Sequence, residues 1–152
     1  MSGSAMDAKL SALYQELILD HYRRPRNKGT LSTATASASL RNPLCGDEVD
    51  VHVEMHDGRV ADVRFGGRGC SISQASASMM TELVKGRTAD EVTRLGERFA
   101  DMIRGDETAA ADEALGQARA LSGVARFPTR VRCALIAWEA MARAVNPGRE
   151  RA

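Results

Sequence analysis

Three cysteines and one aspartate are the residues of this chain whose chemistry most needs an explanation. Cys45 and Asp47 stand one glycine apart in the segment NPLCGDE, while Cys70 and Cys133 lie far along the chain. Free cysteines are usually small buried hydrophobic residues, so one interpretation is structural filling. The other is that the four side chains face one common ligand. The second is favoured, because every thiol is predicted at the end of a helix or strand and off its apolar stripe.

Three thiolates and a carboxylate suit a tetrahedral zinc ion or a small iron–sulfur cluster, and soft thiolates argue against magnesium or calcium. Gly46 would allow the tight turn that two neighbouring ligands require. A zinc site of this type would keep a charge of about −2. Arg68 and Arg132 could offset that charge, or they could simply be solvated. No CxxC pair is present, so the residues alone leave zinc and a cluster both open.

Length and composition predict one domain over residues 1–152 with a single core. A formal net charge of +1 gives no global reason to bind nucleic acid. No apolar run approaches the roughly 18 residues of a membrane span, and the first residues contain no secretory apolar region. Three cysteines cannot all pair within the chain. These features together favour a reducing cytoplasm, where thiols are free, bound to metal or reactive.

The elements that must position the four side chains begin with a helix and a sheet. Apolar residues recur at helical spacing from about 8 to 22, and a weakly marked first strand is expected within residues 30–40. VDVHVEM then alternates with its valines on one face, and Asp57-Gly58 predicts a hairpin turn. The following run, RVADVRF, alternates again, which predicts that three of its side chains point inward: Ala61, Val63 and Phe65.

Helical periodicity follows the strands. Ser71 with Gln74 predicts a capping box for one helix, and Thr88 with Glu91 predicts another for a helix ending near Ile103. Residues 105–125 are alanine-rich and weakly helical, and are interpreted as an inserted segment. A last helix is expected from about Thr129 to Val145, with an apolar stripe that includes Val131, Leu135, Trp138 and Met141. Strands followed by helices predict an α+β fold, in which helices pack on one face of a small three-stranded antiparallel sheet.

Long motifs in this sequence resemble the SufU-type proteins of the U-type iron–sulfur cluster assembly family, relatives of IscU and of the NifU N-terminal domain. They are LYQELILDHYRRPRNKG, NPLCGDEVDV, GRGCSISQASASMM and RVRCALIAWEA, and the resemblance covers nearly the whole chain. It implies the α+β fold with a zinc site at one end of the sheet. It also implies that the metal ligands are Cys45, Asp47, Cys70 and Cys133.

Two features resemble the SufU branch. IscU-like scaffolds have a histidine directly before the last cysteine, where this chain has Arg132, and they lack the segment corresponding to residues 105–125. This resemblance implies a zinc-dependent sulfurtransferase that accepts persulfide sulfur on Cys45 from a SufS-type cysteine desulfurase and serves downstream iron–sulfur assembly proteins. The alternative is a scaffold that holds a [2Fe–2S] cluster. A purely structural zinc module is a third possibility, because four protein ligands would close a zinc site.

The other candidate residues have simpler interpretations. His52 and His56 fall on the polar side of their strand and are expected to face solvent, and His21 is expected to suit the dipole at a helix end. The methionines at 79 and 80 are expected in the core. A basic stretch is either a solvated helix end or a docking site for an acidic patch on the desulfurase: Arg23, Arg24, Arg26 and Lys28.

Overall fold

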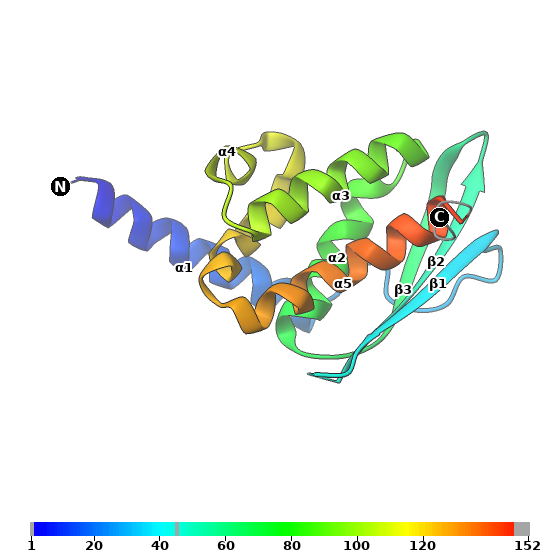
Figure 1. The fold of residues 1–152 in the computed structure, drawn as a ribbon, viewed down its shortest axis with the longest axis horizontal. Helices are drawn as coiled ribbons and strands as arrows, with labels where there is room; N and C mark the ends of the chain where they lie inside the picture. The colour runs from blue at the N-terminus through cyan, green and yellow to red at the C-terminus, as the bar shows by residue number, and fades with distance from the viewer. Residues whose placement is uncertain (1, 45, 148–152) are drawn as a thin grey trace.

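The chain folds as a small sheet covered by helices. The computed structural model describes residues 2–44 and 46–147, with side chains from residue 11 onward. Helices gather on one side of the sheet, with α5 running between the sheet and the other helices (Figure 1). The predicted α+β class is confirmed. In chain order the elements are α1 Ser2–Arg23, β1 Ala36–Asn42, β2 Asp47–His56, β3 Arg59–Arg68, α2 Ser71–Val84, α3 Ala89–Ile103, α4 Glu107–Ala110, the 3₁₀ helix η1 Glu113–Arg126 and α5 Pro128–Val145.

The sheet is an antiparallel meander in the order β1-β2-β3. Its β2–β3 turn is the predicted hairpin, with positive φ at both Asp57 (52°) and Gly58 (74°), as a type I′ turn requires. Val49, Val51 and Val53 are fully buried on the helix side of β2. The alternation of β2 thus provides one apolar face for the helices, and its other face carries polar side chains.

One inward position of β3 was predicted wrongly. The strand pairing shifts between Glu54 and Met55, so that Met55 pairs with Val60 and Glu54 pairs with Asp62. Ala61 is the extra residue and is exposed, whereas Val60 is buried. A bulge changes which residues of a strand face the core, and simple alternation cannot reveal it.

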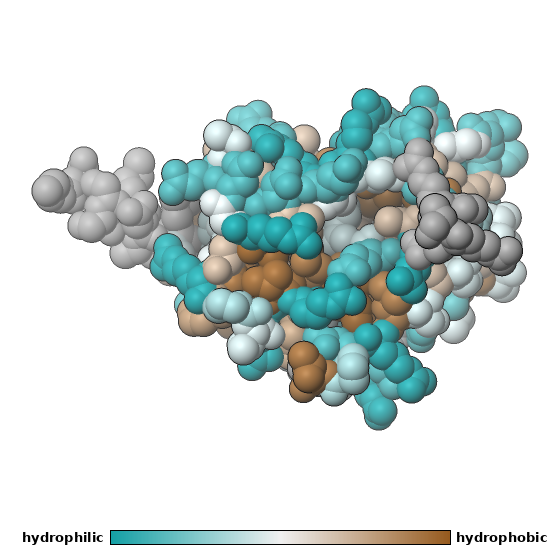
Figure 2. Space-filling view, in the orientation of Figure 1, coloured by the Kyte–Doolittle hydropathy of each residue, from teal (hydrophilic) through white to brown (hydrophobic). Residues whose placement is uncertain are grey.

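Helix α5 is buried on more than the predicted stripe. It packs against β1 and β2 on one side and against α2, α3 and η1 on others. Its Trp138 ring stacks on Phe99 of α3, with ring centroids 4.9 Å apart. Most of its apolar side chains are buried, and apolar surface shows between hydrophilic side chains near the middle of the face drawn in Figure 2. Because α5 packs against so many elements, the residues near its start are held in place relative to the sheet and the other helices.

Residues 105–126 contribute to the core and do not form a peripheral excursion. Helix η1 packs on α1, α2, α3 and α5, and its Leu115 and Leu121 are fully buried. Its two parts meet at Gly116, where φ is 50°. Whether this segment is an insertion relative to other family members stays a prediction.

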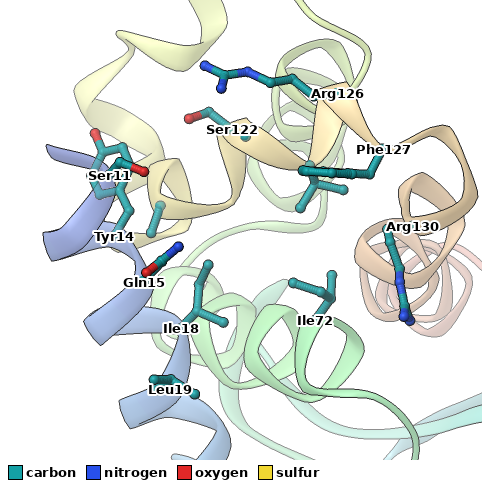
Figure 3. A pocket seen from close by; sticks show the side chains of 13 residues that line it. Ser11, Tyr14, Gln15, Ile18, Leu19, Ile72, Ser122, Arg126, Phe127 and Arg130 are labelled. Carbon is teal, nitrogen blue, oxygen red and sulfur yellow. The ribbon is translucent and has the colours of Figure 1, made fainter. Parts of the chain in front are cut away.

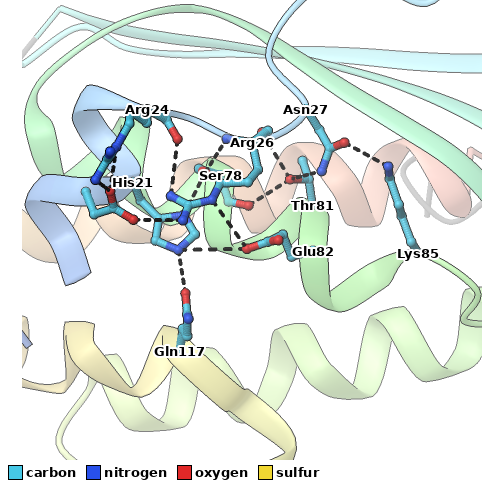
Figure 4. Close-up of polar contacts among 10 residues, drawn as sticks. His21, Arg24, Arg26, Asn27, Ser78, Thr81, Glu82, Lys85 and Gln117 are labelled. Atoms are coloured by element: carbon cyan, nitrogen blue, oxygen red, sulfur yellow. Dashed lines mark hydrogen bonds and ion pairs between the residues drawn. The ribbon is translucent and has the colours of Figure 1, made fainter.

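His21 is a buried residue and does not lie at a solvated helix end. Its Nδ1 lies 2.7 Å from Ser78 Oγ, and its Nε2 lies 2.6 Å from Gln117 Oε1 (Figure 4). The ring therefore joins α1 to α2 and η1. Because an amide oxygen only accepts, the geometry corresponds to a proton on Nε2 and to a Ser78 hydroxyl that donates to Nδ1. His21 lies in the last turn of α1, as expected, and its interaction with the helix dipole stays a prediction beside this interhelical role.

No helix in the described part of the chain combines the length and the apolar character needed to cross a bilayer.

Candidate metal centre

Three of the four predicted ligand side chains converge at one end of the sheet. Asp47 is the first residue of β2, Cys70 lies directly before α2, and Cys133 lies near the start of α5. One donor atom from each lies within 4.8 Å of the other two. Cys45, the fourth predicted ligand and the predicted sulfur acceptor, lies outside the described residues. Gly46, which follows it, has the positive φ (72°) expected of a tight turn.

Asp47 is held in the site from two directions. Its carboxylate is fully buried, and Oδ1 accepts a hydrogen bond of 3.0 Å from the backbone N–H of Cys70. Gly69 lets this approach occur: a Cβ there would lie 2.4 Å from Asp47 Oδ1 and 2.4 Å from Ser73 Oγ. The start of β2 and the start of α2 are therefore fastened together through the carboxylate, with no room for a side chain at position 69.

Cys70 itself is the N-cap of α2, so the capping box predicted from Ser71 and Gln74 is wrong. The Cys70 carbonyl accepts the Gln74 N–H, and no side chain caps the helix. Gln74 instead accepts a hydrogen bond from Lys28 through Oε1.

Cys133 is more deeply buried than its position on the helix suggested. It was expected to be a poor core residue because it lies off the predicted apolar stripe. Its side chain is in fact fully buried. Other elements cover α5 on several sides. The Cys133 side chain therefore lies beside Asp47 and Cys70 and is not exposed to solvent.

The cation at the site is Arg130, which the sequence analysis did not single out. Its guanidinium interacts with the Cys133 and Cys70 thiols, which raise the pKa of Arg130 above its usual value. The two arginines considered beforehand pair with glutamates instead: Arg68 with Glu48 and Arg132 with Glu139. The sequence could have indicated Arg130, because residues three apart on a helix share a face. Arg130 and Cys133 are three apart, whereas Arg132 and Cys133 are adjacent.

An open apolar groove has two of its lining residues close in sequence to the candidate ligands. It has a volume of about 740 Å³ and lies between α1 and η1, with Ile72 of α2 and Arg130 of α5 at its end nearest the cysteines (Figure 3). The same Arg130 therefore borders both the groove and the thiols.

The remaining candidates are not part of the centre. His52 bonds to Ser37 on the polar sheet face, and His56 is exposed, as expected. In the basic stretch, Arg24 and Arg26 both bind Asp20 (Figure 4), which lowers the pKa of that carboxyl. Met79 and Met80 are buried in the core, as predicted.

The donor set fits a soft divalent metal. Two thiols and a carboxylate lie within 4.8 Å of one another, near the roughly 3.8 Å that separates thiolate ligands around tetrahedral zinc. Burying the ionised forms of Asp47 and Cys133 without a compensating cation would be costly, and Arg130 supplies only one positive charge. A bound cation would supply the remainder.

Comparison with known proteins gives the family. Residues 13–147 match the family described as the NifU-like N terminal domain. The chain belongs to this family. The match covers all three described donors and Arg130, so the candidate centre lies within the part of the chain that defines this NifU-like domain.

Relatives of this NifU-like chain include proteins described in two ways. It is 40% identical over 141 residues to the zinc-dependent sulfurtransferase SufU of Bacillus subtilis, covering 93% of this chain and 95% of that one. It is 41% identical over 139 residues to the iron–sulfur cluster assembly scaffold protein IscU of Streptococcus pyogenes, covering 91% and 86%. Nearly equal identities do not separate the two descriptions.

A solved structure agrees with the fold. A protein from Fervidobacterium islandicum, described as an iron–sulfur cluster assembly scaffold for the SUF system, superposes with a TM-score of 0.79 at 32% identity. The match covers 86% of this chain and 94% of that one.

Proposed function

We propose that this NifU-like chain acts in iron–sulfur cluster assembly as a zinc-dependent sulfurtransferase in the cytoplasm. Its sulfur donor would be a SufS-type cysteine desulfurase, and downstream assembly proteins would receive the sulfur. The observation that carries the proposal is the convergence of Asp47, Cys70 and Cys133 beside Arg130. The relative described as a zinc-dependent sulfurtransferase supports the same function.

In this proposal Cys45, Asp47, Cys70 and Cys133 hold the zinc, which would keep its thiolate ligands deprotonated when bound. Asp47 is oriented by the Cys70 amide, and Cys70 and Cys133 are anchored at the starts of two helices. Arg130 balances negative charge at the thiols. Cys45 is left as the acceptor because its sequence neighbours, Pro43 and Gly46, place it in a connecting segment.

The transfer is a thiol–persulfide exchange. The Cys45 thiolate attacks the terminal sulfur of the persulfide on the donor enzyme's cysteine. A new S–S bond forms on Cys45 as the S–S bond of the donor breaks, and the donor cysteine leaves as a thiolate. No external oxidant or reductant is needed, because one S–S bond replaces another.

The test is a Cys45→Ser variant incubated with a SufS-type desulfurase and cysteine. We expect loss of the stimulation of alanine production and loss of the added sulfur mass on this chain. In the parent, peptide mapping should find that mass on the peptide with Cys45 and not on those with Cys70 or Cys133. A zinc-loaded Cys45→Ser variant that carries sulfur as the parent does would show that Cys45 is not the acceptor.

The second candidate is a scaffold for a [2Fe–2S] cluster, which the same ligands could hold and which the IscU relative favours. Anaerobic purification followed by metal analysis separates the two. About one zinc per chain and no visible absorption would support the sulfurtransferase. Iron, inorganic sulfide and a cluster spectrum would support the scaffold.

A further inference from the structure

The groove between α1 and η1 has the chemistry of a protein-docking surface. Its walls are mostly apolar, with Ile18 from α1, Ile72 from α2 and Val124 from η1 (Figure 3). Two large hydrophobic residues at its edges remain accessible: Leu19 is 42% exposed and Phe127 is 60% exposed. Apolar side chains that are exposed together around a hollow mark a contact surface more often than isolated ones do.

The charge of the groove has one sign. Arg126 and Arg130 lie along it, and no carboxylate occurs among the described residues that line it. A ligand that covers the apolar walls and also carries a negative charge would therefore be complementary to the two arginines. The basic stretch after α1 is less suited to this role, because Arg24 and Arg26 are already bound to Asp20.

The position of the groove relates it to the metal centre. Ile72 follows Cys70 by two residues, and Arg130, which lines the groove, precedes Cys133 by three residues on α5. A protein segment seated in the groove would therefore contact residues that lie within three positions of Cys70 and Cys133 in the sequence.

We infer that the groove seats a segment of the sulfur-donor enzyme in which apolar side chains stand next to an aspartate or glutamate. This inference rests on the proposed function, since it names the surface where the donor of that reaction docks. The apolar side chains would lie against Ile18, Leu19 and Phe127, and the carboxylate would pair with Arg126. Because residues 120–127 form one wall, the fold of η1 would decide which desulfurases this chain accepts.

The test compares matched surface variants in binding to a SufS-type desulfurase by isothermal titration calorimetry. Leu19→Asp lies in the groove, whereas Leu13→Asp changes a leucine of the same helix that is 51% exposed and does not line it. Arg126→Glu changes the charge of the groove, and Arg94→Glu makes the same change on the exposed side of α3. We expect each groove variant to weaken binding about tenfold or more, as for central interface residues. Each control should stay within about twofold, with zinc content unchanged in all four.

Hydrogen exchange of the parent chain provides a second measurement that needs no variant. The desulfurase should slow exchange in the middle of α1 and over residues 120–127. If Leu19→Asp and Arg126→Glu bind as tightly as their controls while sulfur still reaches the parent chain, the groove is not the docking site. The sulfurtransferase proposal then stands. If the parent neither binds a desulfurase nor accepts sulfur, both proposals are overturned. Burial of the groove in a dimer of this chain would also overturn the assignment.

Discussion

The guanidinium of Arg130 interacts with the thiol of Cys133, one helical turn further along α5, and this interaction raises the pKa of Arg130. This contact places a fixed positive charge beside two of the candidate ligands, whereas Arg132, two residues away, is turned toward Glu139. The Cys133 and Cys70 thiols favour the charged form of the guanidinium, which is why the pKa of Arg130 is raised.

Arg130→Gln should make metal retention more sensitive to acid. Ligand thiols must lose their protons to bind zinc, and the variant lacks the cation that favours their ionised forms. The pH at which half of the zinc is released should therefore rise relative to the parent. A zinc-release titration with a chromogenic chelator measures it. Arg132→Gln is the matched control and should titrate as the parent does; an equal shift in both variants would contradict a specific role for Arg130.

Removal of the metal should destabilise the whole domain. The described donors come from β2, α2 and α5, so zinc binding would contribute directly to the free energy of unfolding. At this chain length a loss of about 2 kcal/mol lowers the melting temperature by about 4–8 °C. Calorimetry of the zinc-loaded and chelated protein checks this. An unchanged melting temperature would mean that the metal contributes little to the fold.

Asp47→Ala should lose less zinc affinity than Cys70→Ser. The aspartate is the only hard ligand among soft ones, so the bond to zinc that is lost with it is weaker than a thiolate bond. It also frees the Cys70 N–H that Oδ1 accepts, so the alanine variant should be less stable as well. Competition with a chelator of known affinity ranks the two variants, and a weaker affinity for Asp47→Ala would refute this order.

Gly69→Ala should damage the site through packing alone. The new Cβ would lie 2.4 Å from Asp47 Oδ1 and from Ser73 Oγ, so the carboxylate has to move. We expect lower zinc content and a lower melting temperature. Gly96→Ala is the control, because its Cβ would lie 3.6 Å from Trp138, an ordinary contact, and alanine is favoured within a helix. If Gly69→Ala retains zinc like Gly96→Ala, the close approach at Gly69 is not required.

His21→Ala should lower the free energy of unfolding by about 2–4 kcal/mol, because it leaves a cavity and removes the partner of the buried Ser78 hydroxyl. His56→Ala, on the exposed end of β2, should change it by less than about 0.5 kcal/mol. Urea denaturation gives both values. Similar midpoints for the two variants would show that the His21 contacts contribute little.

Local patterns predicted much of the fold. The Asp57-Gly58 turn and the box between Thr88 and Glu91 depend only on neighbouring residues, and both are confirmed. The inward face of β3 was wrong at Ala61 because a bulge depends on pairing with β2. The role of His21 was missed because its partner Gln117 lies 96 residues away.

The candidate site also has features that the sequence predicts and features that depend on the three-dimensional structure. The family resemblance selected Asp47, Cys70 and Cys133, which the structure brings together. Helical spacing alone could have indicated Arg130 as the neighbour of Cys133. The predicted cap at Ser71 failed because Cys70 takes the N-cap position. The fastening of Cys70 to Asp47 depends on a glycine with no room for a side chain, and such a contact is visible only in three dimensions.

The spread of the donors along the chain has a consequence during synthesis. Asp47 and Cys70 leave the ribosome well before Cys133, which follows all three strands and η1. A nascent chain ending in η1 holds only two of the three described donors and lacks the central helix that buries them. Metal binding by all three donors would therefore follow the docking of α5, and until then the Cys70 thiol would stay open to competing metals and oxidants.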